Sequence, residues 1–358
     1  MTTKSIPSPQ VLHKARLRGR LAGVAVLLAV NSGLILLGLC VLELTFGNWL
    51  LPYVPPQASM FDRKLVFMQE LYEPRSEVTY IRDRYGLRGL NSPISNLDLM
   101  TVGGSTTDQI YITEGETWQD VIHLRTGIAI ANAGVEGMTS AGHIVSVEDW
   151  LHRIPNLHAR YFLHYVGVND AALPSFPPPW DSWSRQLRPR SAIWHSVTKF
   201  RDWLADPIVI DHAAVHAWKV SPGEWIKAEV DRSRINDYVE KAFKPNLRRL
   251  LDIHGRNGES AIFVSQPANP LFFKHELDTV FLAHPDRELV EWAVALHESN
   301  SATGAVCHEK PERCRFIDLA QAVSFEPADF YDLVHYTPSG ARKIGEFLAR
   351  ELYFVRGS

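Results

Sequence analysis

A serine follows two glycines in the stretch LMTVGGSTTD, residues 99–108. The apolar run before the glycines is typical of a buried strand, and the glycines permit a tight turn with close backbone approach. Ser105 is therefore either a nucleophile raised at the end of a strand or an ordinary cap of the helix that follows. Asp108 and Glu116 are interpreted as charges at helix starts.

Residues elsewhere in the chain could supply the rest of a nucleophilic ester-cleaving site. His335 lies in YDLVHYTPSG, and Asp332, three residues earlier, can bond Nδ1 and fix the tautomer of the imidazole. Gly134, in NAGVEGMTS, follows a predicted strand, where a backbone N–H can point toward a substrate. Asn169, in YVGVNDA, could donate its side-chain amide to an oxyanion. Each has an ordinary alternative: a structural histidine, a turn glycine or an Asn-Asp turn.

The elements that must position these residues alternate along the chain. Short apolar runs predict strands at 97–102, 128–131, 161–166, 261–264 and 315–319. Helical patterns lie at 115–126, 140–153, 233–255, 285–298 and 338–353. This alternation predicts an α/β fold with a parallel sheet covered by helices on both faces. The candidate residues then meet where the strands end, at the carboxyl edge of the sheet.

Four blocks in this order resemble those of the SGNH hydrolases of the GDSL-like superfamily. They are VGGSTTDQIYITEGETWQDVI, IANAGVEGMTS, YVGVNDA and DLVHYTPSGARKIGEFLA. The blocks span residues 97–350. The resemblance implies a three-layer α/β/α flavodoxin-like fold. The segment YIRDRYGLRG, residues 80–89, resembles the lead-in of membrane-anchored members.

The resemblance also implies a role for each candidate residue. Ser105 would be the nucleophile, His335 the general base and then acid, and Asp332 the residue that orients it. The N–H groups of Ser105 and Gly134 and the amide of Asn169 would hold the oxyanion. One position departs from the family, whose name motif has Gly-Asp-Ser where this chain has Gly104 before the serine, so the hydrogen bonds around the turn must differ.

The N-terminal part predicts a membrane anchor. Residues 21–42 form an uncharged apolar run, long enough as a helix to cross a hydrocarbon core of about 30 Å. Five basic residues precede it, which places the N-terminus in the cytoplasm and the rest beyond the inner membrane, in the periplasm. The predicted organisation is a cytoplasmic tail at 1–20, an anchor at 21–43, a linker at 44–75 and a hydrolase-like domain at 76–358.

Residues 172–230 interrupt the alternation with a Trp- and Pro-rich insertion, which holds six of the ten tryptophans. These tryptophans either pack the insertion onto the core or form a lid or platform beside the site. Trp180 and Trp183 are candidate substrate-lining residues. Gln266, in SQPANP at the end of a predicted strand, either lines the site or belongs to a proline-rich turn.

The cysteines and the net charge bear on three further questions: a disulfide, a metal site and nucleic-acid binding. Cys307 and Cys314 stand close together in CHEKPERC, and in an oxidising compartment a disulfide is favoured over free thiols. Only His308 is near them, so a zinc site there is not expected, and no metal or cofactor is predicted. The net charge of −3 gives no indication of nucleic-acid binding.

The predicted function is an extracytoplasmic, membrane-tethered serine esterase that removes acetyl or other short acyl groups from a carbohydrate. One alternative is an O-acyltransferase acting on an exported polysaccharide, which needs a multi-span membrane partner because one span offers no route for a cytoplasmic acyl donor. A lipase or lysophospholipase is another alternative. A non-catalytic glycan-binding protein is disfavoured because all four blocks keep their chemical residues.

Overall fold

The computed structural model describes residues 9–47, 49–50, 63–89, 93–173, 190–194, 196–197, 200, 225–227, 229–276, 279–282 and 287–356. The chain forms two compact units. One contains Met1–Leu50 with Arg190–Asp206, and the other contains Leu51–Pro189 with Pro207–Ser358. Trp180 and Trp183 lie outside the described residues, so their predicted lining role stays a prediction.

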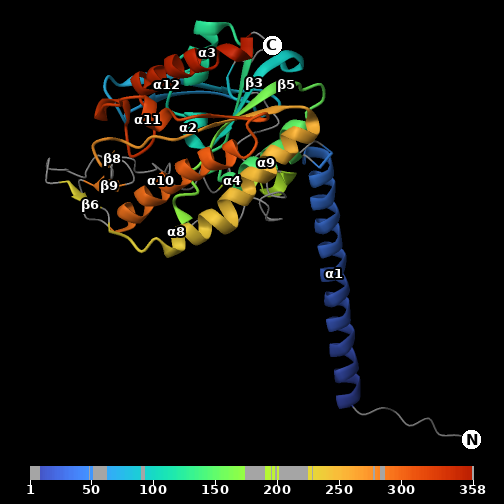
Figure 1. The fold of residues 1–358 in the computed structure, drawn as a ribbon. Helices are drawn as coiled ribbons and strands as arrows, with labels where there is room; N and C mark the ends of the chain where they lie inside the picture. The colour runs from blue at the N-terminus through green and yellow to red at the C-terminus, as the bar shows by residue number, and fades with distance from the viewer. Residues whose placement is uncertain are drawn as a thin grey trace, which may run out of the picture. The chain divides into compact units, whose positions relative to one another are not determined.

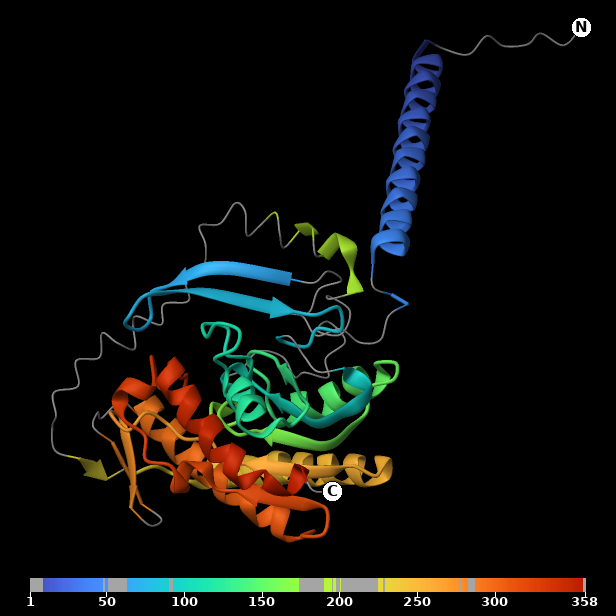
Figure 2. The same ribbon diagram turned by 90° about the horizontal axis from the view of Figure 1, so that it is seen from above.

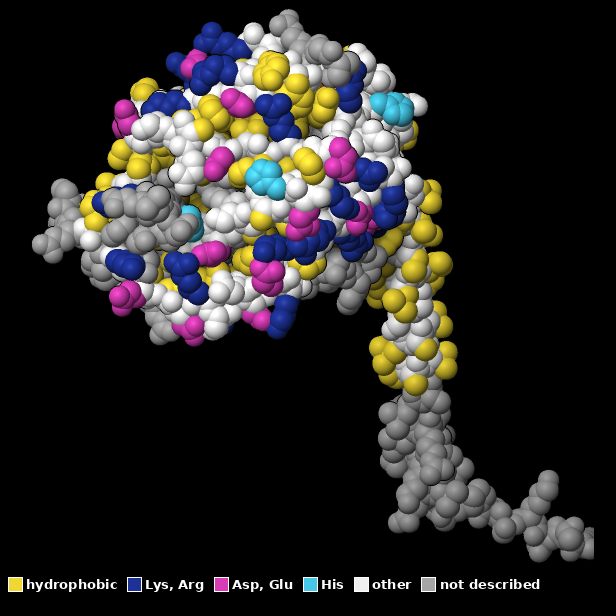
Figure 3. Space-filling view, in the orientation of Figure 1, with side chains coloured by type: hydrophobic (Ala, Val, Ile, Leu, Met, Phe, Trp, Pro, Cys, Tyr) yellow, Lys and Arg dark blue, Asp and Glu magenta, His cyan; other side chains and the backbone are white. Residues whose placement is uncertain are grey.

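The first unit is built on the helix α1 (Pro9–Phe46). Its segment Gly23–Phe46 has 24 residues and a mean hydropathy of 2.5, so it is long and apolar enough to cross a membrane. None of this segment is buried within the described part of the protein. Figure 3 shows apolar side chains along its described length. A signal sequence meets the same criterion. At the end of the helix, the Glu43 carboxylate accepts hydrogen bonds from the backbone N–H groups of Ala192, at 3.0 Å, and Ile193, at 3.1 Å.

A parallel five-stranded sheet forms the centre of the second unit, as the alternation predicted. Its strands are β3 (Leu97–Gly103), β4 (Ile130–Gly134), β5 (Ala159–Tyr165), β7 (Ser260–Val264) and β10 (Cys314–Ile317). Their order across the sheet is β10-β7-β5-β3-β4, and every neighbouring pair is parallel. This is the flavodoxin-like order, in which the chain reverses direction across the sheet between β3 and β5.

Helices cover both faces of this sheet (Figure 1). One layer holds α3 (Trp118–Thr126) and α12 (Pro338–Glu351). The other holds α4 (Ser140–Val145), α9 (Lys244–Asn257) and α10 (Arg287–His308). Successive side chains of a strand point to opposite faces. In β5, Leu163 and Tyr165 accordingly pack with the α3/α12 layer, whereas Phe162 packs with the α4/α9 layer.

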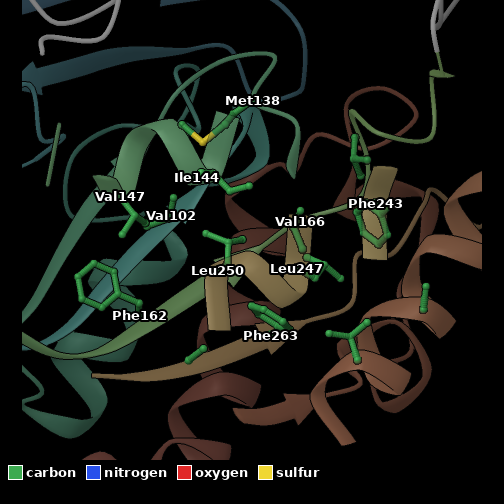
Figure 4. Close-up of a cluster of buried hydrophobic side chains, with 14 of the residues drawn as sticks. Val102, Met138, Ile144, Val147, Phe162, Val166, Phe243, Leu247, Leu250 and Phe263 are labelled. Atoms are coloured by element: carbon green, nitrogen blue, oxygen red, sulfur yellow. The ribbon is translucent and has the colours of Figure 1, made fainter. Parts of the chain in front are cut away.

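The core between the sheet and the α4/α9 layer is shown in Figure 4. There Val102 and Phe162 from the strands face Ile144 from α4 and Leu247 and Leu250 from α9. All five side chains are buried. The layer is therefore held by ordinary apolar packing, which contributes about 1.5–3 kcal/mol for each large aliphatic side chain removed from water.

Local signals begin and end the principal helices. Thr117 and Asp120 form a reciprocal capping box at the start of α3. Thr337 caps α12, and Pro338 occupies its first turn. The left-handed Gly258 ends α9. The predicted helix 140–153 divides into α4, the π-helix η2 (Ser146–Trp150) and the short η3 (Leu151–Arg153), and the helix predicted at 285–298 continues to His308 as α10.

Shorter elements connect these layers. The helices before α9 are α8 (Ser233–Tyr238) and the π-helix η6 (Val239–Phe243). Single turns or short helices occur at η1 (Ile94–Asn96), α2 (Ser105–Asp108), α11 (Leu319–Ala322), η7 (Pro327–Asp329) and η8 (Tyr353–Arg356). The sulfurs of Cys307 and Cys314 are bonded, which joins the last turn of α10 to the first residue of β10.

Two antiparallel sheets stand outside the predicted pattern. The hairpin of β1 (Arg63–Gln69) and β2 (Ser76–Arg82) precedes the parallel sheet (Figure 2). A second sheet contains β6 (Ile226–Lys227), β8 (Phe273–Glu276) and β9 (Thr279–Leu282). The predicted linker at 44–75 therefore ends earlier than expected, because β1 begins at Arg63 and pairs along its whole length with β2.

Candidate active site

Three side chains from distant parts of the chain form a hydrogen-bonded relay. Ser105 Oγ lies 2.7 Å from His335 Nε2. His335 Nδ1 lies 2.6 Å from Asp332 Oδ2. The Asp332 side chain is only 7% exposed and that of His335 is 19% exposed, so the carboxylate is shielded while the imidazole reaches the surface. This geometry suits transfer of the serine proton to an imidazole whose tautomer is fixed by a carboxylate.

The loop of Asp332 and His335 is held rigidly by backbone contacts. Asp332 Oδ1 accepts hydrogen bonds from the backbone N–H groups of Val334, at 2.9 Å, and His335, at 2.8 Å. The side chain of Asn269 donates to the Asp332 carbonyl at 3.0 Å. Both oxygens of the Asp332 carboxylate are thus engaged, so its orientation toward the imidazole is fixed.

An aromatic ring stacks on the imidazole of His335. The rings of Tyr331 and His335 are stacked with centroids 5.5 Å apart and planes inclined by 8°. Burial raises the pKa of the Tyr331 phenol well above its usual range, so the ring stays neutral. The His335 imidazole thus has an uncharged aromatic neighbour on this side.

Ser105 and Asn169 come together because β3 and β5 are neighbours. Ser105 begins α2 directly after β3, and Asn169 lies in the loop after β5. Asn169 Nδ2 donates to the Met138 carbonyl at 2.9 Å, which leaves its second amide hydrogen for another acceptor. The place where the strand order reverses is where ligands bind in open α/β sheets.

Gly104, the departure from the family motif, is explained by this asparagine. A Cβ on Gly104 would lie 2.4 Å from Asn169 Nδ2, far inside van der Waals contact. A side chain at residue 104 would therefore have to displace the Asn169 amide from its place beside the backbone. In this chain the absence of a side chain at residue 104 makes room for the Asn169 amide.

The structure corrects the expected role of Gly134. Its N–H donates to Asn132 Oδ1 at 2.8 Å inside the protein, and a Cβ there would lie 2.3 Å from the backbone nitrogen of Asp108. Gly134 is thus a close-packing glycine whose N–H is already engaged. Gly137, further along the same block, has a φ of 69°, and the position of its missing Cβ faces open space. It precedes Met138, the residue that binds the Asn169 amide.

Gln266 supports the site from beneath and does not line it. The residue is 2% exposed. Its Nε2 donates to Thr106 Oγ1 at 2.9 Å, and its Oε1 accepts from the Val168 backbone N–H at 2.6 Å. Gln266 thus connects the neighbours of Ser105 and of Asn169, which fixes the separation of two strand ends.

A buried ion pair that was not predicted lies next to the turn that carries Ser105. Arg82 and Asp108 have side chains that are each 1% exposed, with Nη2 and Oδ1 2.8 Å apart. Arg82 also donates to the Gly134 carbonyl at 2.8 Å and to the Gly86 carbonyl at 2.6 Å. Asp108 thus lies in the first turn of α2, as predicted, and its buried carboxylate anchors the turn that carries Ser105 to Arg82. The sequence shows only that Arg82 belongs to the lead-in segment YIRDRYGLRG. Its burial, which is rare for arginine without a charged partner, could not be read from the sequence.

Asp170 fixes the loop that carries Asn169. Its Oδ1 accepts hydrogen bonds from the hydroxyls of Ser140, at 2.6 Å, and Tyr238, at 2.7 Å. Its Oδ2 accepts from the Ser140 backbone N–H at 2.8 Å. Burial raises the pKa of Asp170 to about 6, although these bonds oppose the shift. The Asn-Asp pair is thus anchored to the start of α4.

Comparison with solved structures finds chains of similar architecture. A member of the lipolytic protein G-D-S-L family from Veillonella parvula is 13% identical, with a TM-score of 0.41, over 72% of this chain and 97% of its own. A GDSL-like lipase from Bacteroides thetaiotaomicron is 12% identical, with a TM-score of 0.39, over 74% and 91%. A variant of an acetyl xylan esterase from Geobacillus stearothermophilus is 14% identical, with a TM-score of 0.39, over 72% and 94%. No family model and no curated protein matches the chain.

Proposed function

We propose that this protein is a serine ester hydrolase in which Ser105, His335 and Asp332 form the catalytic triad. The relay of 2.7 Å and 2.6 Å between these three side chains is the observation that carries the proposal. Ser105 Oγ attacks the ester carbonyl while His335 Nε2 takes its proton, and Asp332 stabilises the imidazolium. The same imidazolium then protonates the leaving alkoxide, and an attacking water repeats the sequence to free the acid.

The oxyanion donors in this proposal are the Ser105 N–H, the Asn169 amide and the Gly137 N–H. Ser105 begins a helix, where the first N–H groups have no partner within the helix. Asn169 is held beside Gly104 by its bond to Met138. Gly137 is proposed for this role in place of Gly134 because it directly precedes Met138, whose carbonyl holds the Asn169 amide. Each aligned donor contributes about 10²–10³ to the rate of such reactions.

The proposed substrate is a carbohydrate carrying acetyl or other short acyl groups, beyond the inner membrane. The apolar helix at Gly23–Phe46 and the basic residues that precede it support an anchor with the catalytic unit in the periplasm. The aromatic-rich insertion supports a carbohydrate, since sugar rings stack on aromatic faces; its described residues Trp194 and Trp225 are exposed. Retention of the N-terminal helix in the intact mass of membrane-extracted protein tests the anchor, because a cleaved signal sequence would be missing.

Hydrolysis of nitrophenyl esters of increasing acyl length by the full-length protein in detergent tests the chemistry. We expect the short esters to be cleaved fastest, with kcat/KM falling by about 10⁴-fold or more in Ser105→Ala. Activity equal to that of Ser105→Ala at every chain length would overturn the proposal.

Acetylated oligosaccharides as substrates then test the carbohydrate class through the release of acetate. A preference for long acyl chains would instead indicate a lipase or lysophospholipase. Acylated sugar in place of free acetate, when an acceptor glycan is added, would indicate acyl transfer.

A further inference from the structure

A second cluster of polar side chains lies on the α4/α9 side of the sheet, apart from the triad. It joins His143 of α4, His164 of β5, His254 of α9, Glu259 just before β7, and His152 of η3. Nothing in the ester-cleaving chemistry uses these groups. The sequence predicted no metal, and His152 and Glu259 are 107 positions apart, so spacing gave no signal of the cluster.

Hydrogen bonds connect these side chains in one line. His143 Nδ1 lies 3.0 Å from His164 Nδ1, and His164 Nε2 lies 2.8 Å from His254 Nε2. His254 Nδ1 lies 2.7 Å from Glu259 Oε2. At the far end, His152 Nε2 lies 3.1 Å from both carboxylate oxygens of Glu259. The line thus runs from the apolar interior to a pair of partly exposed residues.

The outer end of the line has the donor set of a transition-metal site. One ligand atom from each of His152, His254 and Glu259 lies within 4.8 Å of the others. The side chains of His152 and Glu259 are 21% and 15% exposed, whereas His254 is 1% exposed, so an ion has access from one side only. Two imidazoles and a carboxylate are the protein ligands of many zinc sites that keep a fourth position for water.

We propose that His152, His254 and Glu259 bind a divalent transition-metal ion of the zinc class. Metal-ligating histidines are normally oriented by a hydrogen bond from their other ring nitrogen. His254 has this arrangement, because its Nε2 is bonded to the buried His164 while its Nδ1 faces Glu259. The ion would lie at the surface of the α4/α9 layer. It would link η3, which carries His152, to α9 and the connection between α9 and β7, which carry His254 and Glu259.

The line of histidines gives the proposal a distinctive consequence. Without metal, His254 donates its Nδ1–H to Glu259, so His164 donates from Nε2 and His143 donates from Nδ1. His143 and His164 are both fully buried, and burial disfavours a charged imidazole, so each ring carries one proton. A metal on His254 Nδ1 moves the proton of that ring to Nε2. The protons of His164 and His143 must then move to Nδ1 and Nε2 respectively.

The two proton arrangements differ at the inner end of the line, at His143 Nε2. His143 Nε2 is buried and has no hydrogen-bond partner among the described residues. It is a bare lone pair in the metal-free arrangement and an N–H in the metal-bound one. An ion held by His254 therefore changes the protonation of a side chain two hydrogen bonds away, inside the core.

Cobalt and zinc titrations of the untagged, chelator-treated full-length protein test the site. We expect one equivalent of Co²⁺ to give the visible absorption of a four-coordinate ion, and Zn²⁺ to displace it. His152→Ala and Glu259→Gln should weaken binding at least tenfold. His158→Ala, which removes an exposed histidine outside the cluster, should bind as the wild type does. Absence of binding, or equal binding in His152→Ala, overturns the proposal.

Nitrogen-15 NMR of the labelled histidines gives a second, independent readout. Zinc should move the proton of His164 from Nε2 to Nδ1 in the wild type and leave it in place in Glu259→Gln. Zinc binding without this change would show that His254 Nδ1 is not a ligand, and so would also overturn the site as proposed. Neither measurement depends on ester hydrolysis, so this proposal and the proposed function can fail separately.

Discussion

Placing a methyl group at residue 104 should damage the oxyanion site through one neighbour. In Gly104→Ala the new Cβ would lie 2.4 Å from Asn169 Nδ2, whereas ordinary van der Waals contact begins near 3.4 Å. The Asn169 amide must therefore move by about 1 Å. That movement breaks its 2.9 Å bond to the Met138 carbonyl and takes its second hydrogen away from the oxyanion.

The expected loss follows from the removal of one donor. Loss of one oxyanion donor lowers kcat by about 10²–10³, or about 2.7–4 kcal/mol of transition-state stabilisation. KM should change little, because the negative charge on the carbonyl oxygen develops only in the transition state. The melting temperature should fall only slightly, since the displaced atom ends a side chain and is not backbone.

A double-mutant cycle with Asn169→Ala tests this reasoning on nitrophenyl acetate. If the methyl group acts only through the Asn169 amide, the double variant should be no slower than Asn169→Ala alone. Additive losses of kcat would refute the mechanism, because they would show that residue 104 acts on something else. Wild-type activity in Gly104→Ala would refute the steric conflict itself.

Three further predictions concern stability. Burial lowers the pKa of His143 to about 3, against about 6.5 in an unfolded chain. Between these values the unfolded state binds one more proton than the folded state, so the free energy of unfolding decreases as the pH is lowered below 6.5. His143→Gln should reduce that slope by about 1.4 kcal/mol per pH unit between pH 6 and 4.5 in urea titrations; an unchanged slope contradicts the burial of a neutral imidazole. Arg82→Met should cost about 3–5 kcal/mol in the same assay, because the buried Asp108 carboxylate loses its ion-pair partner and, among the described residues, keeps only the Tyr80 hydroxyl. The control Arg125→Met breaks the exposed pair with Glu346 and should cost less than about 1 kcal/mol, and equal costs would contradict the role of burial. Reducing the disulfide between Cys307 and Cys314, separated by 7 positions, should cost about 2.5 kcal/mol. The double serine variant should lose a similar amount and show no response to reductant.

The parallel sheet could be predicted because each of its strands is a buried apolar run. All five strands lie within three residues of their predicted bounds. The hydrogen-bonded set of Ser105, Asp332 and His335 could be singled out because these residues follow such a strand or precede a well-signalled helix. The hairpin was missed although β1 contains the apolar run LVFM, because this segment was assigned to the linker and most of its side chains are exposed instead of buried.

Contacts between distant residues could not be predicted from local patterns. The engagement of the Gly134 N–H depends on Asn132, whose side chain turns back to accept its hydrogen bond. The role of Asp108 depends on Arg82, which reaches it from β2 in the lead-in segment. Likewise, Gln266 is polar and follows a strand, as a lining residue would, but its partners at Thr106 and Val168 bury it.

The hairpin of β1 and β2 also determines how the catalytic unit responds to mechanical force. A pull on the chain ahead of Arg63 loads β1 at the residue that pairs with Arg82, at the open end of the hairpin. Force applied there unzips the ladder one pair at a time instead of shearing all its bonds together. The hairpin therefore extends first, while Arg82 keeps its bonds to Asp108 and the Gly134 carbonyl. Force from the N-terminal side therefore acts on the β1–β2 ladder before it reaches the turn that carries Ser105.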